Sequence, residues 1–182
     1  FWWRWRLGEL VMLMRLSRLF KHRWADDTQR SVSPATLERL TLQVASSETR
    51  HSGEIRLCIE AALPNSYLLR PDATAALIHQ RALNQFARLR VWDTAQNNGV
   101  LIYLLLAEHA IEVVADRGLN QHVSVADWQA LVARLIQHLQ AGAFEAGLSQ
   151  ALSEVSALLA NHFPLAAGEK NPNELPDRPA VK

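Results

Sequence analysis

Residues 100–106 form an unbroken apolar run, VLIYLLL, in the middle of the chain. A strand in which every side chain is apolar is typical of the centre of a sheet that is covered on both faces. Residues 107–109 allow only a tight turn, and residues 110–115 (AIEVVA) are again mostly apolar. Because so short a connection joins antiparallel neighbours, the two runs predict a pair of antiparallel strands.

Another strand is predicted earlier in the chain, at residues 54–61. Apolar side chains occupy every second position there and alternate with Glu54, Arg56, Cys58 and Glu60. This alternation predicts a strand with one buried face.

A helix is predicted between this strand and the central one. Its inner face is expected to carry Leu77, Leu83, Phe86 and Leu89. A strand that reaches the next strand through a helix runs parallel to it, with a right-handed crossover. The sheet is therefore predicted to be mixed.

Start and stop signals predict the remaining helices. Ser33 is an N-cap followed by proline, which starts a helix over residues 33–48. Ser124 starts a helix that ends near residue 142, and a last helix covers residues 144–159. The order helix, strand, helix, strand, strand, helix, helix predicts an α/β fold. We expect a three-layer α/β/α sandwich, a small mixed β-sheet flanked by helices.

The chain divides into four parts. Residues 1–24 form a basic, aromatic, amphipathic segment, and residues 25–32 form a polar linker. The domain proper is predicted over residues 33–164. Residues 165–182 are rich in proline and asparagine, and we expect this tail to be extended and largely unpacked.

Charge is distributed unevenly along the sequence. Residues 1–24 carry six Lys/Arg against one Glu, so about +5, and the remainder is about −4 because the total is +1. The mildly acidic body argues against a nucleic-acid-binding domain. A single cysteine, Cys58, excludes an internal disulfide and suits cytosolic or redox-neutral packing.

The N-terminal segment suggests contact with a membrane surface. Arginines interrupt its apolar run, so it predicts neither a membrane span nor a signal peptide. Trp2, Trp3, Arg4, Trp5 and Arg6 suit an interface where rings lie at headgroup depth and guanidinium groups meet lipid phosphates. The alternatives are a helix that packs on the domain or on a partner, or a translated upstream extension.

Polar side chains are predicted to gather at one end of the sheet. Given the strand directions, the start of the first strand, the start of the second and the exit of the third share that end. Glu54, residues 93–99 and residues 116–118 occupy these places. Carboxylate and amide oxygens are ligands for hard divalent cations such as Ca²⁺ or Mg²⁺. The alternative is ordinary turn chemistry, in which Asn-Asn-Gly and Asp-Arg-Gly only shape the backbone.

Standard enzyme signatures are missing from the sequence. Cys58 lies on a strand without a sign of activation, so a packed thiol is the simpler interpretation. The seven histidines are scattered, without paired metal-ligand spacing, and no phosphate-cradling glycine loop is present. Transition-metal sites are not expected.

The run RVWDTAQNNGVLIYLLLAEHAIEVVADRGL, residues 90–119, resembles the core of TPM-domain proteins. That family includes the thylakoid-lumen TPM phosphatases and many small bacterial proteins described only as membrane proteins. The resemblance extends to residues 51–60 and 144–164, and NELPDRP at residues 173–179 resembles the ending of the short bacterial subgroup. It implies an α/β/α sandwich, in agreement with the predicted order of elements.

The resemblance also implies a divalent-cation site near the NNG loop and the acid-phosphatase activity of some plant members. Carried over by matching position, Asp93, Asn97, Asn98 and Asp116 would hold the cation, with Glu54 nearby. Larger members have a glycine-rich turn where this chain reads Ala-Asp-Arg-Gly-Leu. Arg117 could therefore bind a phosphate oxygen bidentately. It could equally neutralise Asp116.

Two functions follow as hypotheses. The first is a non-catalytic interaction module, stabilised by Ca²⁺, in the bacterial envelope or at its inner surface. Its N-terminus would contact the membrane, and its sheet-end loops would contact a protein partner. The expected location is membrane-associated or cytoplasmic. The alternative is a weak metal-dependent acid phosphatase, in which a cation on Asp93, Asn98 and Asp116 polarises a phosphoryl oxygen and Arg117 steadies the developing charge.

Overall fold

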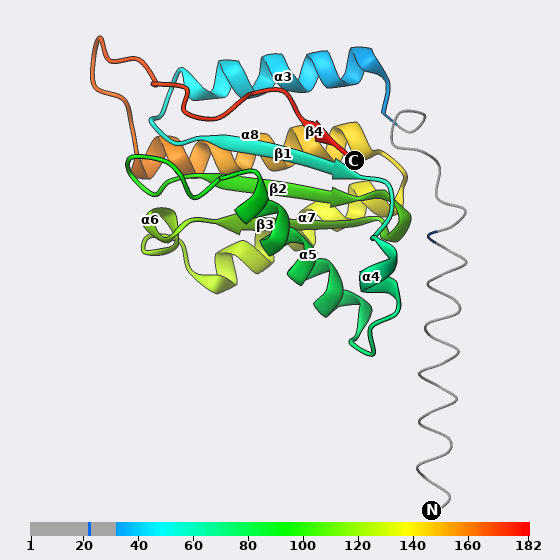
Figure 1. Ribbon diagram of the computed structural model, residues 1–182. Helices are drawn as coiled ribbons and strands as arrows, with labels where there is room; N and C mark the ends of the chain where they lie inside the picture. Colours follow the sequence, from blue (N-terminus) through cyan, green and yellow to red (C-terminus); the bar gives the residue numbers. More distant parts are fainter. Residues whose placement is uncertain (1–21, 23–31) are drawn as a thin grey trace, which may run out of the picture.

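A four-stranded mixed sheet in the order β3-β2-β1-β4 forms the middle layer of the protein, with helices on both faces (Figure 1). This computed structural model describes His22 and residues 32–182. The strands are β1 (Ile55–Glu60), β2 (Val100–Leu105), β3 (Ala110–Ala115) and β4 (Ala180–Val181). The predicted α/β/α sandwich is confirmed. The predicted membrane contacts at residues 2–6 lie outside the described residues.

The strand directions agree with the sequence. β1 pairs with β2 in parallel, from Ile55 opposite Val100 onward, and β2 pairs with β3 antiparallel, with Val100 opposite Ala115. A short 3₁₀ turn, η1 (Leu106–Glu108), connects β2 to β3, and His109 after it has a left-handed φ of 48°. All residues of β2 are buried, as expected of a central strand.

Three helices cover one face of the sheet: α3 (Pro34–Glu48), α7 (Val125–Gln140) and α8 (Phe144–His162). The predicted start signals of α3 and α7 are present. The Ser33 hydroxyl accepts a hydrogen bond from the backbone N–H of Thr36, and Ser124 forms a capping box with Asp127. Two shorter helices, α4 (Asn65–Leu68) and α6 (Arg117–Asn120), were not predicted.

The prediction of a single buried face for β1 was wrong, because every residue of β1 is buried. The opposite face packs against α5 (Thr74–Arg88), which supplies a partner for the polar side chains there. Arg81 of α5 donates two hydrogen bonds to the Glu60 carboxylate, and the Tyr103 hydroxyl donates a third at 2.8 Å. A charged side chain can be buried when it is paired and hydrogen-bonded in this way.

The side of α5 that faces the sheet differs from the predicted one and includes Arg81. Arg81 is buried, whereas Leu83, which was predicted on the inner face, is 45% exposed. The inner stripe runs through Ile78, Ala82 and Gln85, at the spacing of one helix face. Leu83 falls on the other side of that stripe.

The C-terminal tail was predicted to be extended and largely unpacked, which holds for residues 166–170 and 172–174, whose side chains are exposed, but is wrong for the residues that follow. Its last residues form β4, which pairs in parallel with the outer edge of β1, Ala180 opposite Cys58. In Figure 1 the tail runs along β1 beneath α3. Leu175 is buried, and the Arg56 guanidinium donates to the backbone carbonyls of Pro176 and Arg178. The tail packs because β1 would otherwise present unpaired backbone groups and a buried arginine.

Removing Arg81 tests how strongly the buried pair holds α5 to the sheet. Arg81→Leu is expected to lower the free energy of unfolding by about 3 kcal/mol, because Glu60 stays buried without its cation. Urea unfolding of the full chain measures this difference. The control is Arg134→Leu, since Arg134 pairs with Glu154 on the exposed side of α7 and its loss should change stability little. Equal effects of the two variants would contradict this role of the buried pair.

Candidate functional site

The loops at residues 93–99 and 116–118 pair beyond the ends of β2 and β3. The backbone N–H of Asp116 donates to the Gly99 carbonyl, and that of Gly118 donates to the Asn97 carbonyl, each at 2.9 Å. A Cβ atom at Gly118 would lie 2.5 Å from the Asn97 carbonyl oxygen, so only glycine permits this approach. We refer to these two segments below as the paired loops.

The Arg117 side chain lies across the paired loops and bonds to Asn97 of the first loop, not to the carboxylate of the neighbouring Asp116. Its guanidinium donates to the side-chain oxygen Oδ1 of Asn97, from Nε at 3.1 Å and from Nη2 at 2.7 Å. Asn97 has a left-handed φ of 53°, which asparagine tolerates better than most residues. Arg117 therefore ties the second loop to the first through a side chain as well as through the backbone.

Two buried side-chain oxygens in the paired loops have no hydrogen-bond partner among the described residues: Oδ2 of Asp116 and Oδ1 of Asn98. The other Asp116 oxygen caps α6 by accepting the Arg117 backbone N–H at 2.7 Å. The Asn98 amide nitrogen donates weakly to the Ser52 hydroxyl, at 3.4 Å. An unsatisfied buried acceptor costs about 1–3 kcal/mol, so these oxygens call for a donor or a cation.

Asp93 and Glu54, the other predicted ligands, face different neighbours. Asp93 is exposed and pairs with Arg90, which is three residues earlier in the chain. Glu54 is fully buried, and its Oε2 accepts the backbone N–H of Leu175 at 3.1 Å, while its Oε1 has no partner among the described residues. Burial, chiefly, raises the pKa of Glu54. Glu54 thus lies behind the C-terminal tail, whereas Asp93 lies on the outer surface of its loop.

Sequence reasoning missed a group of carboxylates around Glu54. Glu48, at the end of α3, accepts the backbone N–H of Ile55 at 2.9 Å, and Glu174 of the tail accepts the N–H of Ala95. Both Glu48 and Glu54 interact electrostatically with Asp177. The tail residues Glu174 and Asp177 were visible in the sequence, but only the packing of the tail brings them here.

The oxygen chemistry of the paired loops fits a hard divalent cation better than a transition metal. The fit rests on the unpaired oxygens of Asn98 and Asp116, which come from adjacent loops. Within His22 and residues 32–182, no group of three or more His, Cys, Asp or Glu side chains is arranged to hold a metal ion. In the structure, the groups in place for a cation are the Asp116 carboxylate and the amide and backbone oxygens of the paired loops, while Asp93 is paired with Arg90.

Two further titratable groups, His51 before β1 and Cys58 within it, are structural. His51 is fully buried between the Gly53 carbonyl and the Ser156 hydroxyl, and burial lowers its pKa to about 4. Cys58 is buried in the core beside α5, and burial raises its pKa to about 12, which keeps the thiol protonated. Cys58 is therefore the packed thiol that the sequence predicts.

The pH dependence of stability tests the burial of Glu48. Burial raises its pKa to about 8 from the ordinary 4.5, so the folded chain keeps a proton that the unfolded chain releases between these values. The stability from this group is fully present below pH 4.5 and is lost as the pH rises through about 8. The Glu48→Gln variant keeps the hydrogen bond to Ile55 and lacks the titration. It should become the more stable protein above pH 6, by up to roughly 1.4 kcal/mol per pH unit.

Urea unfolding of both proteins at several pH values measures this difference. His51 contributes stability that is lost as the pH falls toward about 4, but both proteins contain it and it cancels in the comparison. Glu38→Gln, on the exposed side of the same helix, is the matched control. A difference between Glu48→Gln and the parent that stays constant from pH 5 to 9 would show that Glu48 titrates normally.

Comparison with known proteins places the chain in a family. The family model described as the TPM domain matches residues 25–158. Among solved structures, the chain is similar to the NMR structure of the BA42 protein from the psychrophilic bacterium Bizionia argentinensis. The two share 24% sequence identity and a TM-score of 0.68, over 82% of this chain and 94% of that one. No curated protein matches. Since the family model covers most of the chain, this protein belongs to the TPM domain family.

Proposed function

We propose that this TPM domain is an interaction module that binds a divalent cation, Ca²⁺ or Mg²⁺, at the paired loops. The observation that carries the proposal is the pair of buried oxygens, Oδ1 of Asn98 and Oδ2 of Asp116, without a partner among the described residues. A divalent cation prefers carboxylate and amide oxygens of this kind. Its charge would also offset that of the Asp116 carboxylate.

In this proposal the residues of the chain differ in role. Asp116 and Asn98 hold the cation from the inside of the paired loops, and Asn97 keeps Arg117 beside it. Asp93 joins them by exchanging its exposed partner Arg90 for the cation, at small cost because exposed ion pairs contribute little. Glu54 supports the site from behind the tail. Cation binding then sets the shape of the exposed loop surface that meets a protein partner.

The membrane part of the proposal rests on the N-terminal sequence and on one described contact. His22 accepts the backbone N–H of Leu63 at 3.0 Å and lies 2.9 Å from the Glu108 carboxylate. Leu63 and Glu108 follow β1 and β2, so His22 contacts the domain at the end of the sheet opposite the paired loops. An anchor at residues 1–24 would therefore leave these loops facing away from the membrane. No helix in the described part of the chain has the length and apolar character to cross a bilayer.

Cation titration followed by amide chemical shifts of the full chain tests the site. Ca²⁺ or Mg²⁺ is expected to shift the amides of residues 93–99 and 116–118. Asp116→Asn should weaken binding about tenfold or more, because affinity depends on the charge of the ligands. Asparagine still caps α6, so the fold should be retained. Asp72→Asn, which removes a carboxylate before α5, is the control. A chain whose loop amides do not move at millimolar cation has no such site.

Co-sedimentation with anionic lipid vesicles tests the membrane contact. The full chain is expected to sediment with the vesicles and to be released by salt, because aromatic and basic side chains both contribute. Replacing Trp2, Trp3 and Trp5 by alanine and Arg4 and Arg6 by glutamate should abolish sedimentation. Undiminished sedimentation of this variant would place the contact elsewhere on the chain.

The alternative function, a weak metal-dependent acid phosphatase, gains no separate support from the site. Arg117, which would steady the transferred phosphoryl group, directs two of its donors to Asn97. The cation-loaded chain is therefore expected to leave a phosphate monoester unhydrolysed.

A further inference from the structure

The outer edge of β3 offers unpaired backbone groups. β3 is the last strand of the sheet on the side away from β1. Asp116 bonds to Gly99, and antiparallel bonding alternates, so the backbone N–H and C=O groups of Ile111, Val113 and Ala115 point away from β2. Asn120 occupies the Ala115 carbonyl, donating to it at 2.8 Å. The outward N–H and C=O groups of Ile111 and Val113 have no hydrogen-bond partner among the described residues.

The sequence of β3 does not protect this edge. Exposed edge strands are commonly blocked by lysine, proline, a bulge or a covering segment. β3 reads AIEVVA, with Glu112 as its single charged residue, and it pairs with β2 without a bulge. An unprotected edge of this kind is a template for another strand.

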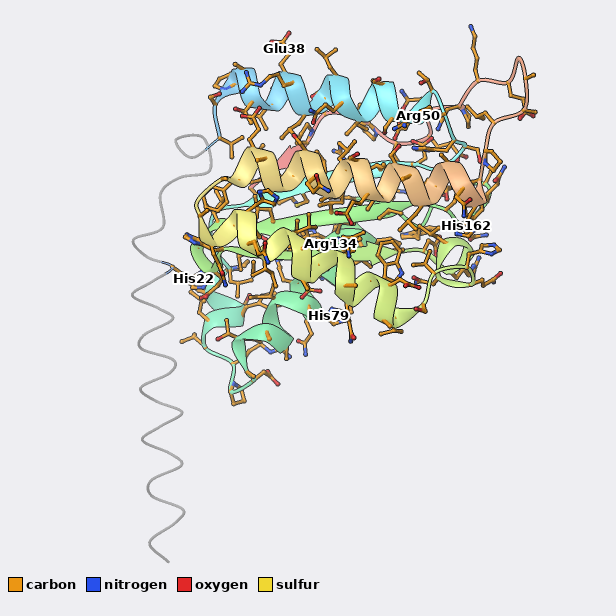
Figure 2. The ribbon with its side chains drawn as sticks, turned by 180° about the vertical axis from the view of Figure 1, so that it is seen from behind. His22, Glu38, Arg50, His79, Arg134 and His162 are labelled. Carbon is orange, nitrogen blue, oxygen red and sulfur yellow. The ribbon has the colours of Figure 1, made fainter. Side chains whose placement is uncertain are left out.

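The edge lies at the floor of an apolar groove between α5 and α7. The groove has a volume of about 570 Å³, within the range of ligand sites. Leu83 of α5 and Val125 and Ile136 of α7 line it, and they are half of the large apolar side chains that are exposed in the described part of the chain. In Figure 2 His79 marks the α5 wall of this groove. Exposed apolar side chains thus gather along the unpaired edge.

The shape of the groove favours a single extended segment over a second copy of the chain. Paired strands must approach to about 4.8 Å, and in a second copy the same edge also lies between two helical walls. Pairing two copies at this distance would also bring the α5 and α7 walls of one copy against those of the other. A single extended segment has no walls, and β3, at six residues, is long enough to pair with a pentapeptide.

The walls also determine the side chains that fit. Side chains of an added strand alternate between the two walls. The α7 wall presents Trp128, Val132 and Ile136, which suit apolar side chains. The α5 side presents the Glu112 carboxylate beside His79, at 3.1 Å, which suits lysine or arginine.

We propose that the β3 edge binds an extended segment of a partner protein, with alternating apolar and basic side chains, as a fifth strand of the sheet. Backbone hydrogen bonds to Ile111 and Val113 supply affinity, and the two walls supply specificity. This surface lies beside β3 and between the helices, and it requires no cation. Its failure and that of the paired-loop site are therefore separate outcomes.

Amide chemical shifts of the full chain, recorded in EDTA, test the proposal with the peptide acetyl-Ile-Lys-Val-Lys-Ile-amide. We expect saturable shifts at Ile111 and Val113, slower hydrogen exchange of these amides, and a Kd of about 1 mM or below. The same peptide with backbone N-methyl groups keeps its side chains but loses donors, and it should not bind. Equal binding of the two peptides would overturn strand addition.

Charge exchange tests the specificity with a variant that keeps the fold. Glu112→Lys should lower the affinity for the lysine peptide about fivefold and raise the affinity for acetyl-Ile-Glu-Val-Glu-Ile-amide by a similar factor. Glu38→Lys, at an exposed position of α3, is the matched control and should change neither affinity. Val113→Pro, which removes an outward N–H, should abolish binding. The absence of shifts on β3 at millimolar peptide would overturn the proposal. Shifts on β3 that follow the protein concentration without peptide would also overturn it, in favour of self-association.

Discussion

The burial of the polar face of β1 is the constraint on which the rest of the structure depends. Arg56, Cys58 and Glu60 alternate with the apolar core residues of the same strand, and all of them are buried. Glu60 is accommodated because Arg81 and Tyr103 donate to its carboxylate, which attaches α5 to the sheet. Arg56 is accommodated because the tail provides backbone carbonyls, which attaches the tail to the edge of β1. One alternating strand thus determines the position of a helix and of the C-terminus.

These two attachments position the sheet end that carries the candidate site. α5 leads directly into residues 93–99, and a Cβ atom at Gly99 would lie 2.0 Å from the Val91 carbonyl, so this loop returns closely on itself. The tail covers Glu54 and brings Glu174 to the backbone of Ala95. The loops are therefore held on both sides, while Asn98 and Asp116 retain buried oxygens without partners among the described residues. Each buried acceptor of this kind requires a donor, a water molecule or an ion.

The two surfaces proposed for binding differ in chemistry and position. The paired loops are polar, carry backbone and amide oxygens, and lie at one end of the sheet. The groove along β3 is apolar, offers unpaired backbone groups, and lies along the side of the sheet between α5 and α7. Binding at both would suit a domain that joins partners, and neither surface needs a catalytic group.

The sequence by itself determined the sheet and most of its helices, because local patterns carry that information. The run at residues 100–106 and the tight turn after it predicted a buried strand and an antiparallel neighbour, and Ser33 and Ser124 marked helix starts. It also predicted which loops share one end of the sheet. Contacts between distant segments decided that Glu60 and Arg56 are buried, that Leu83 is exposed, and that the tail ends in a short strand beside β1. The reason is that partners distant in sequence compensate buried charges and unpaired edges, and no local pattern records which partner arrives.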